Sequence, residues 1–505
     1  MDIKTINIPL DAAGKRLSEY LASEGYSISA DCGGRGTCGK CKVEVVKGEF
    51  LDVDGKAIAP DADGRILSCR AFCPEGGAVV KLRDAAVGAA HPTVNPSDGE
   101  KISKVDYESL GLAIDIGTTT VVIALLDEKS GRVVAHRTFL NPQKAYGADV
   151  VSRITASTEG HLDEMQSILI RDIERHTKDA LAGLGVTENF PLTAAVAANP
   201  TMLHILCGIS PEGMGKYPFT PVFLDTKVID GKELFGGLNV DKVTLLPSAS
   251  AFVGSDVTGG VYVCGMTSAI TKPSLLVDLG TNGEAVLCLG EEKGGRLICT
   301  STAAGPALEG AGISCGTGGI AGAVCAVRLV DGKLEYDTVM SCPPIGICGS
   351  GLVDLISCLL ELEIIDETGY MEDDFSLCDN VTLTQDDVRQ FQLAKAAIRA
   401  GLEVLLDEGN LTWQDLGHLF IAGGLGNHIH YESAVKIGLF SPDFCGEAKA
   451  VGNTSLAGAM AVLLDAPDVG ALDAIERAAG ECPFIELNLS SLFSEEFMMR
   501  MSFEE

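Results

Sequence analysis

The distribution of hydrophobic and polar residues changes along the chain, and this change predicts where strands and helices lie. From residue 111 onward, short apolar runs bounded by glycine-rich turns alternate with longer stretches of helical periodicity. The first pattern is typical of buried strands and the second of amphipathic helices. The helical pattern is clearest in residues 146–158, 161–185, 349–366, 384–410 and 453–465. Residues 109–505 are therefore predicted to form a mixed α/β domain.

Two segments of this region predict strand-turn-strand hairpins. Residues 111–127 place two apolar strands around a threonine-rich turn, and residues 274–290 repeat the arrangement far along the chain. No short repeat of the kind that builds a solenoid is visible. Two related hairpins at long spacing instead indicate a duplicated α/β unit with two lobes.

The first part of the chain has a different pattern. Short β-rich runs occupy residues 4–10, 42–50 and 78–84, and they predict a small β-grasp-like ferredoxin module in residues 1–83. Residues 84–108 are poor in bulky apolar side chains and rich in Ala, Pro, Gly and charge. Such a composition is typical of a linker between domains.

Composition excludes some classes of function. The chain carries 70 acidic and 38 basic residues, a formal net charge of -32, which argues against binding to the phosphate backbone of nucleic acid. It begins with charged residues and holds no apolar stretch of membrane-spanning length. We therefore expect a cytoplasmic protein that contacts no membrane, whose 17 cysteines are reduced thiols plus a metal site.

Four cysteines form the predicted metal site. Cys32, Cys38 and Cys41 lie in a glycine-rich loop with the spacing C-x5-C-x2-C, and Cys69 follows at a distance. The first gap is one residue longer than in the plant-type pattern that binds a 2Fe-2S cluster. Zinc is the competing interpretation, but zinc sites usually pair two short cysteine or histidine units. Cys73 is either a substitute ligand or a small buried hydrophobic residue.

Each hairpin carries an Asp at the end of an apolar strand, followed by glycine and by hydroxyl or amide side chains. Such a turn brings amide and hydroxyl donors close to phosphate oxygens, and the Asp can hold Mg2+ directly or through water. The first turn contains Asp115, Gly117, Thr118, Thr119 and Thr120. The second contains Asp278, Gly280, Thr281, Asn282, Gly283 and Glu284.

A third segment, residues 419–427, is an apolar strand that runs into a Gly-Gly-x-Gly sequence. Its polar end consists of Gly423, Gly424, Gly426 and Asn427. Glycines at these positions allow the backbone to pack closely against a flat ligand such as adenosine. The chain has no G-x-x-x-x-G-K-[ST] sequence, so a Walker-type ATPase is disfavoured.

In order and spacing, these three segments resemble the phosphate-1, phosphate-2 and adenosine motifs of the acetate and sugar kinase, Hsp70 and actin superfamily. The resemblance implies a nucleotide cleft between two ribonuclease-H-like lobes. It also implies that Asp115 and Asp278 organise Mg2+, that the two turns bind the phosphates of ATP, and that residues 423–427 line the adenosine. Glu284 polarises the attacking water, binds Mg2+ indirectly, or is merely a turn residue.

A 2Fe-2S module tethered to this ATPase fold resembles the reductive activators of corrinoid proteins. Residues 141–154 and 301–316, among other stretches, support the resemblance. It implies that the chain binds ATP and a corrinoid protein and passes one electron from the cluster to Co(II), producing Co(I) for methyl transfer. An upstream electron donor and a possible homodimer follow from the same resemblance.

Two alternatives remain open from the sequence. One is a small-molecule kinase with a regulatory cluster, and the other is an ATP-switched redox carrier or chaperone-like binder. The resemblance also carries a negative expectation. Longer members of the family have an additional domain between linker and ATPase, and we expect that domain to be absent or reduced here, because the first phosphate turn begins just after the linker.

Overall fold

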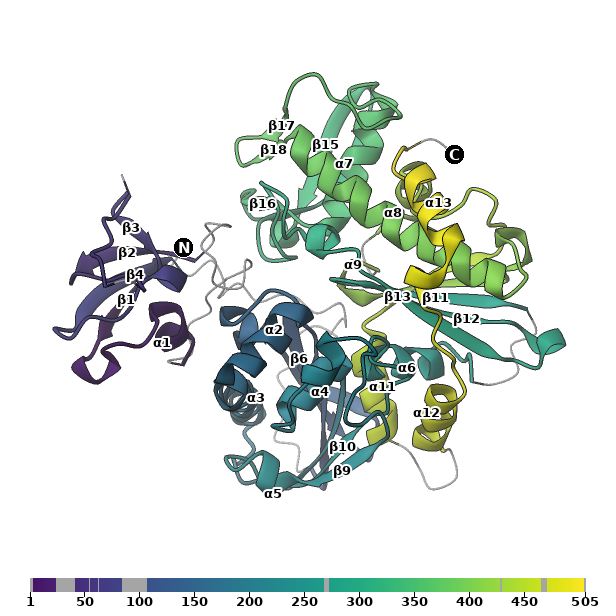
Figure 1. Ribbon diagram of the computed structural model, residues 1–505. Helices are drawn as coiled ribbons and strands as arrows, with labels where there is room; N and C mark the ends of the chain where they lie inside the picture. The colour runs from purple at the N-terminus through teal and green to yellow at the C-terminus, as the bar shows by residue number, and fades with distance from the viewer. Residues whose placement is uncertain are drawn as a thin grey trace.

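The computed structural model describes residues 3–23, 41–53, 55–61, 63–83, 107–267, 272–426, 429–464 and 470–503. Figure 1 shows a small module at the N-terminal end of the chain and a larger body in two lobes. The predicted linker, residues 84–108, lies almost entirely outside the described residues.

The N-terminal module is built on a four-stranded sheet in the order β1-β4-β2-β3. Leu17, Leu21, Phe50 and Val80 are buried in its core. The β-rich runs predicted from the sequence are all present as strands. The elements are β1 (Ile3–Ile8), η1 (Leu10–Ala12), α1 (Leu17–Ser23), β2 (Lys42–Lys47), β3 (Arg65–Leu67), η2 (Ser68–Arg70) and β4 (Ala78–Arg83).

The first lobe contains a six-stranded sheet in the order β7-β6-β5-β8-β10-β9. Strands β5, β6 and β7 form an antiparallel meander, whereas β8 and β10 run parallel to β5. The strands are β5 (Leu110–Ile116), β6 (Thr120–Asp127), β7 (Arg132–Leu140), β8 (Leu192–Ala198), β9 (Lys227–Asp230) and β10 (Val240–Leu245). The helices are η3 (Pro142–Ala145), α2 (Val150–Ala156), η4 (Ser157–His161), α3 (Leu162–Gly183), α4 (Pro200–Leu206), η5 (Glu212–Gly215), α5 (Gly231–Leu234) and α6 (Ser255–Val263).

The second lobe contains a five-stranded sheet in the order β13-β12-β11-β19-β20. Its main strands are β11 (Ser274–Leu279), β12 (Gly283–Cys288), β13 (Leu297–Thr302), β19 (His418–Ala422) and β20 (Glu447–Gly452). Two smaller sheets consist of β14 (Ala323–Val330), β15 (Lys333–Thr338) and β16 (Gly346–Ile347), and of β17 (Phe375–Cys378) and β18 (Val381–Leu383).

Helices cover and connect the sheets of this lobe. They are η6 (Glu291–Lys293), η7 (Pro306–Glu309), η8 (Val339–Ser341), α7 (Gly349–Glu361), α8 (Gln385–Glu408), η9 (Trp413–Asp415), α9 (Gly423–Gly426) and α10 (Tyr431–Lys436). The last helices of the chain are α11 (Thr454–Leu463), α12 (Ala471–Gly480), η10 (Leu487–Leu489) and α13 (Ser491–Met499).

The two lobes share one topology. In the second lobe, β11, β12 and β13 are antiparallel and β19 and β20 run parallel to β11, which repeats the arrangement around β5. Each repeat begins with a hairpin that the sequence singled out. The prediction of a duplicated ribonuclease-H-like fold is therefore confirmed.

Helices α6 and α11 cross where the lobes meet. A Cβ atom on Gly458 would lie 2.6 Å from the Cα of Gly259, so only glycine permits this close approach of the two backbones. Although α11 follows β20, its residues Leu456 and Ala459 pack in one cluster with Ala113 of β5. The crossing therefore carries the start of α11 to the carboxyl end of β5 in the first lobe.

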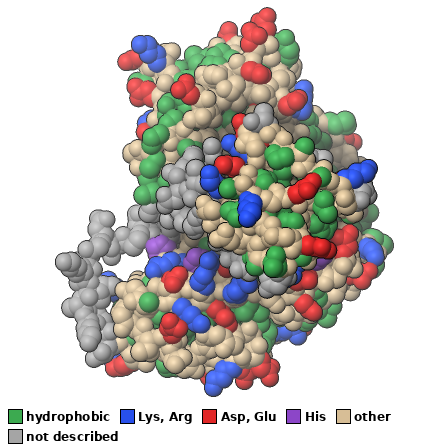
Figure 2. Space-filling model, turned by 90° about the vertical axis from the view of Figure 1, so that its left-hand side faces the viewer, with side chains coloured by type: hydrophobic (Ala, Val, Ile, Leu, Met, Phe, Trp, Pro, Cys, Tyr) green, Lys and Arg blue, Asp and Glu red, His purple; other side chains and the backbone are tan. Residues whose placement is uncertain are grey.

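Within the described residues, no helix combines the length and the apolar character needed to cross a membrane. Figure 2 shows acidic and basic side chains interspersed over one face of the molecule rather than gathered in a single patch.

Candidate functional site

Asp115 lies near the end of β5 and is held by the start of α11. Its Oδ1 accepts a hydrogen bond from Ser455 Oγ at 2.6 Å, and its Oδ2 accepts one from Asn453 Nδ2 at 2.7 Å. Asn453 in turn caps the helix by accepting from the Leu456 N–H at 2.8 Å. Burial raises the pKa of Asp115, and these two hydrogen bonds counteract the rise. The carboxylate is thus fixed from both its strand and a distant helix.

Asp278 and Glu284 face each other across the hairpin of β11 and β12, where they are direct partners in the register. Both lie deep in the site, and burial is the main cause that raises each pKa. The charge of Asp256, at the start of α6, adds to both shifts. The pKa of Asp278 reaches about 8, and that of Asp256 itself about 7 through burial and repulsion by Asp115.

These carboxylates therefore form an acidic cluster, defined as Asp115, Asp256, Asp278 and Glu284, between the two lobes. Like charges held this close disfavour ionisation of one another. A divalent cation or a cation-bound nucleotide relieves that repulsion, because the charge that it brings favours the ionised carboxylates. The cluster thus has the electrostatics of a site for a magnesium-bound phosphate.

Asp256→Asn is expected to stabilise the nucleotide-free protein, most strongly above neutral pH. The folded-state pKa of about 7 exceeds that of an unfolded aspartate, about 3.9, so ionisation of Asp256 lowers stability as the pH rises between these values. Asparagine keeps the oxygen that accepts from the Val257 N–H at 3.0 Å but carries no charge. Thermal unfolding of the full chain should show a gain roughly two to three times larger near pH 8 than near pH 5.

The matched control for this variant is Asp241→Asn, since Asp241 is exposed on β10. It should shift the unfolding midpoint little at either pH. An equal gain for Asp256→Asn at both pH values, or a loss near pH 8, would contradict the repulsion inferred here.

The first phosphate turn is tight and closely supported. The Gly117 N–H donates to the Thr120 carbonyl at 2.9 Å, and a Cβ on Gly117 would lie 2.7 Å from that oxygen. The Thr118 hydroxyl accepts from Asn199 Nδ2 at 3.1 Å. The guanidinium of Arg153 donates to the Thr118 carbonyl from beneath the turn. The structure therefore holds this turn in one conformation.

The second phosphate turn meets the first through one carboxylate. Glu309 Oε2 accepts from Thr119 Oγ1 at 2.8 Å and from Thr281 Oγ1 at 2.9 Å. Thr119 belongs to the first lobe and Thr281 to the second. Both hydroxyls are predicted phosphate donors, so the structure brings the two predicted turns together as the sequence required.

Two other residues of the second turn have different surroundings. The side chain of Asn282 hydrogen-bonds to Glu284, which lowers the pKa of Glu284 against the larger effect of burial. Gly283 is buried, and a Cβ there would lie 2.6 Å from Ile398 Cγ1 of α8. Gly283 thus packs closely against α8. Its contact with phosphate stays a prediction.

The predicted adenosine segment lies beside the acidic cluster. Gly423 follows β19 with φ of 87°, and a Cβ there would lie 2.6 Å from Asp278 Oδ1. Gly424 is exposed, and a Cβ on it would meet no atom within 4 Å. Gly426 ends the short helix α9, and Asn427 lies outside the described residues. The segment thus combines one tightly packed glycine with an open backbone surface at the next.

In the N-terminal module, the two described cysteines of the predicted metal site lie together. Cys41 precedes β2, Cys69 lies in η2, and both are buried. The Ser68 N–H donates to the Cys41 carbonyl at 3.0 Å, which joins the two segments. Hydrogen bonding from Cys69 lowers the pKa of Cys41 to about 6. A thiol that ionises this readily suits a thiolate ligand.

The other two predicted ligands, Cys32 and Cys38, lie outside the described residues. Cys73 is buried in the same core as Cys41 and Cys69. The described residues contain no set of three His, Cys, Asp or Glu side chains placed to hold a metal ion.

Three family models match the chain in sequence. Residues 2–73 match the 2Fe-2S iron-sulfur cluster binding domain, residues 110–269 the RACo middle region, and residues 272–505 the C-terminal domain of RACo, the ASKHA domain. The corrinoid activation enzyme RamQ of Eubacterium limosum is 32% identical over 425 residues, which cover 78% of this chain and 70% of that protein. The chain belongs to the reductive activators of corrinoid proteins.

Two further similarities agree with membership of this activator family. The [Co(II) methylated amine-specific corrinoid protein] reductase of Methanosarcina barkeri is 25% identical over 389 residues, which cover 70% of each chain. A solved structure of a reductive activator for corrinoid, iron-sulfur protein has a TM-score of 0.71 at 28% identity. That match covers 98% of this chain and 96% of the solved one.

Residues 110–269, which match the family's middle region, include the first phosphate turn. The expectation that a further domain between linker and ATPase is absent or reduced stays a prediction. The same residues contain the six-stranded sheet of the first lobe. In this activator the middle region is thus the first lobe itself, which the sequence assigned to the ATPase fold.

Several residues of the activator's site were not singled out from the sequence. They are Arg153, Asn199, Asp256, Glu309, Asn453 and Ser455. Arg153 carries a sequence signal, because it occupies a position on the apolar face of an amphipathic helix. Its burial lowers its pKa to about 9, and the charges of Asp149 and Glu309 counteract this. Asn453 carries the signal of a helix cap.

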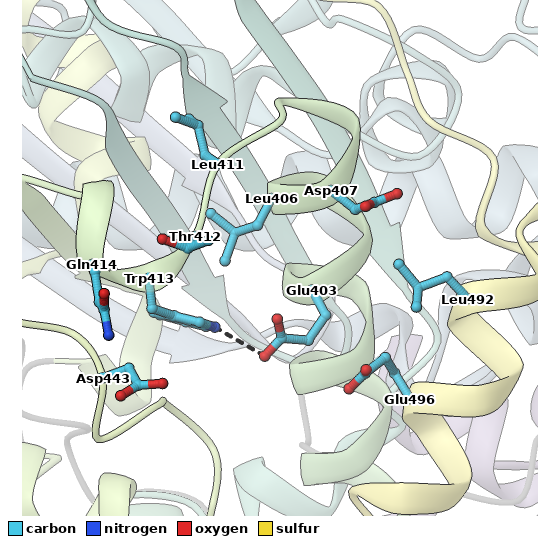
Figure 3. A pocket seen from close by; sticks show the side chains of 10 residues that line it. All are labelled: Glu403, Leu406, Asp407, Leu411, Thr412, Trp413, Gln414, Asp443, Leu492 and Glu496. Atoms are coloured by element: carbon cyan, nitrogen blue, oxygen red, sulfur yellow. Dashed lines mark hydrogen bonds between the residues drawn. The ribbon is translucent and has the colours of Figure 1, made fainter.

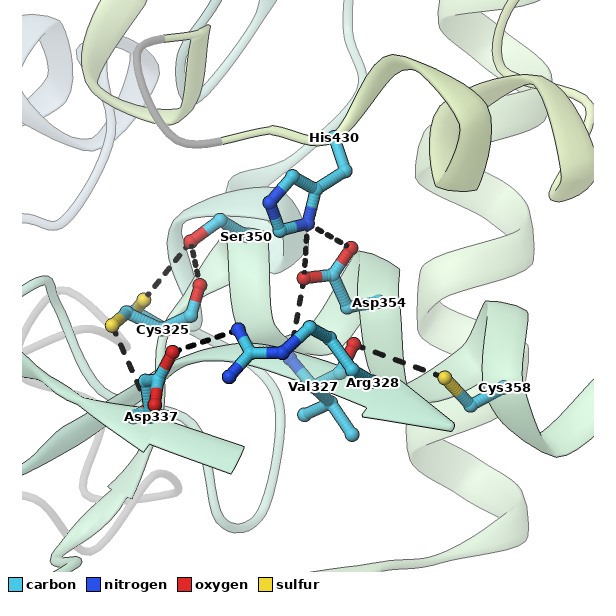
Figure 4. A network of polar contacts seen from close by, with 9 residues as sticks. Cys325, Val327, Arg328, Asp337, Ser350, Asp354, Cys358 and His430 are labelled. Atoms are coloured by element: carbon cyan, nitrogen blue, oxygen red, sulfur yellow. Dashed lines mark hydrogen bonds and ion pairs between the residues drawn. The ribbon is translucent and has the colours of Figure 1, made fainter. Parts of the chain in front are cut away.

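Two of the described histidines, His204 and His430, contact structural partners. His204 is buried, its Nδ1 lies 2.7 Å from the Pro200 carbonyl, and its Nε2 accepts from the Val222 N–H at 3.0 Å. Figure 4 shows His430 above the buried Asp354, with Nδ1 to Oδ2 at 2.8 Å. Both histidines thus have structural partners, and His428 lies outside the described residues.

A cavity of about 390 Å³ lies elsewhere, lined by α8, η9 and α13. Figure 3 shows Trp413 and Glu403 on its wall, joined by a hydrogen bond of 2.9 Å from Trp413 Nε1. Glu403 also accepts from Arg399 Nε at 2.6 Å. No residue of the two phosphate turns or of the acidic cluster lines this cavity, so it is separate from the nucleotide site.

Proposed function

We propose that this chain uses ATP to drive the reduction of a corrinoid protein from Co(II) to Co(I). The proposal rests on the presence of two separate sites in one chain. Cys41 and Cys69 lie together in a 2Fe-2S domain, and two phosphate turns meet over an acidic cluster in the ASKHA fold. The relatives named for corrinoid activation supply the substrate class.

Each site has a defined part in the proposed reaction. Cys32, Cys38, Cys41 and Cys69 would hold the 2Fe-2S cluster, which supplies one electron at a potential of about -400 mV in plant-type proteins. Thr118, Thr119 and Thr281 would donate hydrogen bonds to the phosphates of ATP. Asp115 and Asp278 would position Mg2+ through water, and Gly424 would offer its open backbone surface to the adenosine.

Nucleotide must act on the electron transfer through affinity. Each ~59 mV by which the cobalt couple is more reducing than the donor lowers the equilibrium constant of a one-electron transfer tenfold. ATP changes that balance only if it binds the productive complex more tightly than the separated proteins. Thr119 and Thr281 belong to phosphate turns on different lobes. Nucleotide that binds to both turns can therefore change how the two lobes are placed, and with them the surface that they offer to the corrinoid protein.

The test is an anaerobic spectral assay. The purified chain is mixed with a Co(II) corrinoid protein from the same host and a chemical reductant, which replaces the upstream electron donor, with and without Mg-ATP. Faster appearance of Co(I) with Mg-ATP is the expected result. Phosphate transfer to a small molecule without any corrinoid protein would indicate the kinase alternative instead. Gel filtration of the same preparation would test the possible homodimer.

A further inference from the structure

The backbone around Glu309 is closely packed. Glu309 ends η7 and lies next to Gly310, whose φ of 76° a residue with a side chain adopts at a cost. A Cβ on Gly310 would also overlap the Thr317 backbone. On the preceding side, Leu308 is buried and its carbonyl lies against Gly349 of α7. These contacts fix the backbone at Glu309, from which its side chain reaches both phosphate turns.

A single oxygen of Glu309 makes both contacts with the phosphate turns. Oε2 accepts from Thr119 Oγ1 at 2.8 Å and from Thr281 Oγ1 at 2.9 Å. A phosphate oxygen of a bound nucleotide would likewise be an anionic oxygen that accepts a hydrogen bond from one hydroxyl of each turn. Glu309 thus satisfies the same donors that the proposed function assigns to ATP.

The carboxylate is held there against local repulsion. Its charge adds to the rise in the pKa of Asp278, in which burial is the main cause. The positive charge of Arg153, beneath the first turn, attracts the Glu309 carboxylate. Burial lowers the pKa of Arg153, and the charge of Glu309 raises it. Two hydroxyl donors and the buried guanidinium of Arg153 therefore hold the Glu309 carboxyl group beside an acidic cluster.

We propose that Glu309 is an internal ligand that occupies the phosphate-binding hydroxyls of Thr119 and Thr281 until a nucleotide phosphate displaces it. The proposal rests on the proposed function, because it assumes that ATP binds at these turns. In the nucleotide-free chain, Glu309 joins the two lobes through its side chain. Bound ATP joins them through a phosphate oxygen instead, and release of the products lets Glu309 return.

This role predicts an unusual sign of effect. Removing a site residue commonly weakens ligand binding, whereas removing a competing internal anion strengthens it. Glu309→Ala is expected to bind Mg-ATP about tenfold more tightly than the wild type. In the wild type, ATP must first displace the charge-assisted hydrogen bonds of Glu309 with the two turns, and the variant does not have this cost. Glu309→Gln, which keeps an acceptor oxygen but loses the charge, should lie between the two.

The experiment is calorimetric titration of the full chain with the Mg2+ complex of a non-hydrolysable ATP analogue, and separately with AMP. AMP lacks the outer phosphates, so its affinity should be the same in all variants. Glu292→Gln is the matched control, because Glu292 is exposed in η6, beyond the end of β12 that lies away from the second turn. It should leave both affinities unchanged.

The outcomes separate the two proposals. If the wild type binds no ATP analogue, the proposed function fails and the internal ligand with it. If the wild type binds and Glu309→Ala binds equally or more weakly, only the internal ligand is overturned, and Glu309 instead supports the bound nucleotide. An equal gain for AMP would also overturn it, because the effect would then reflect the fold of the lobe rather than competition with phosphate.

Discussion

Cys41→Ser is expected to abolish reduction of the corrinoid substrate, by at least about a hundredfold, while leaving nucleotide binding intact. Serine has nearly the same shape, but its hydroxyl does not ionise near neutral pH, whereas the Cys41 thiol does so with a pKa of about 6. Thiolate, not thiol, is the ligand of an iron-sulfur cluster. The visible spectrum of the purified chain and its rate of Co(I) formation measure the two consequences.

The control for this variant is Cys445→Ser, since Cys445 is an exposed thiol of the second lobe. It should retain both the spectrum and the rate. Mg-ATP binding by Cys41→Ser provides a second readout, because a binding-competent ATPase body excludes general misfolding. Full reductive activity of Cys41→Ser would show that the electron takes another route and that Cys41 is not a ligand.

Asp278→Asn should lower the ATP-stimulated rate about a hundredfold, with an unchanged cluster spectrum. A fixed charge that acts on a phosphate and its Mg2+ commonly contributes an effect of about this size. Asparagine preserves the size of the side chain, which matters because Gly423 packs closely against Asp278. A Cβ atom on Gly423 would lie 2.6 Å from Asp278 Oδ1. The rate of Co(I) formation with and without Mg-ATP measures the loss.

The pH dependence of Mg-ATP binding distinguishes an electrostatic role from a structural one. In the free protein the pKa of Asp278 is about 8, chiefly because of burial. If Mg2+ requires the ionised form, affinity should rise with pH up to that value, by at most about tenfold per unit. Asp278→Asn should flatten this profile, and Asp241→Asn should keep it. A wild-type profile without slope below pH 8 would contradict a direct role for the Asp278 charge.

The hairpins and long helices could be predicted from the sequence because their patterns are local. Residues 111–127 and 274–290 became β5, β6, β11 and β12, and residues 384–410 became α8, Gln385–Glu408. In each case burial on one or both faces imposes a period on neighbouring residues. The positions of Asp115 and Asp278 at strand ends followed directly, since the apolar runs end there.

Other parts of the site depend on residues that no local pattern connects. Asn453 and Ser455 contact Asp115 from 338 and 340 positions away, and only the crossing of α6 and α11 brings them there. Gly283 is predicted to contact phosphate, and only the structure shows that it also packs closely against Ile398 of α8. The sequence pattern is the same for a glycine that approaches a ligand and for one that approaches a helix.

The sequence by itself determined the order of modules, the repeated hairpins, and the cysteine and aspartate positions, because each depends on spacing along a few neighbouring residues. Only the tertiary structure decided which carboxylates share the acidic cluster and that Glu309 joins Thr119 to Thr281. Those contacts depend on how two separately patterned lobes pack together. This packing depends on the complementary shapes of segments that are distant in the chain, such as those around Gly259 and Gly458. The periodicity within one segment therefore does not predict which other segment it packs against.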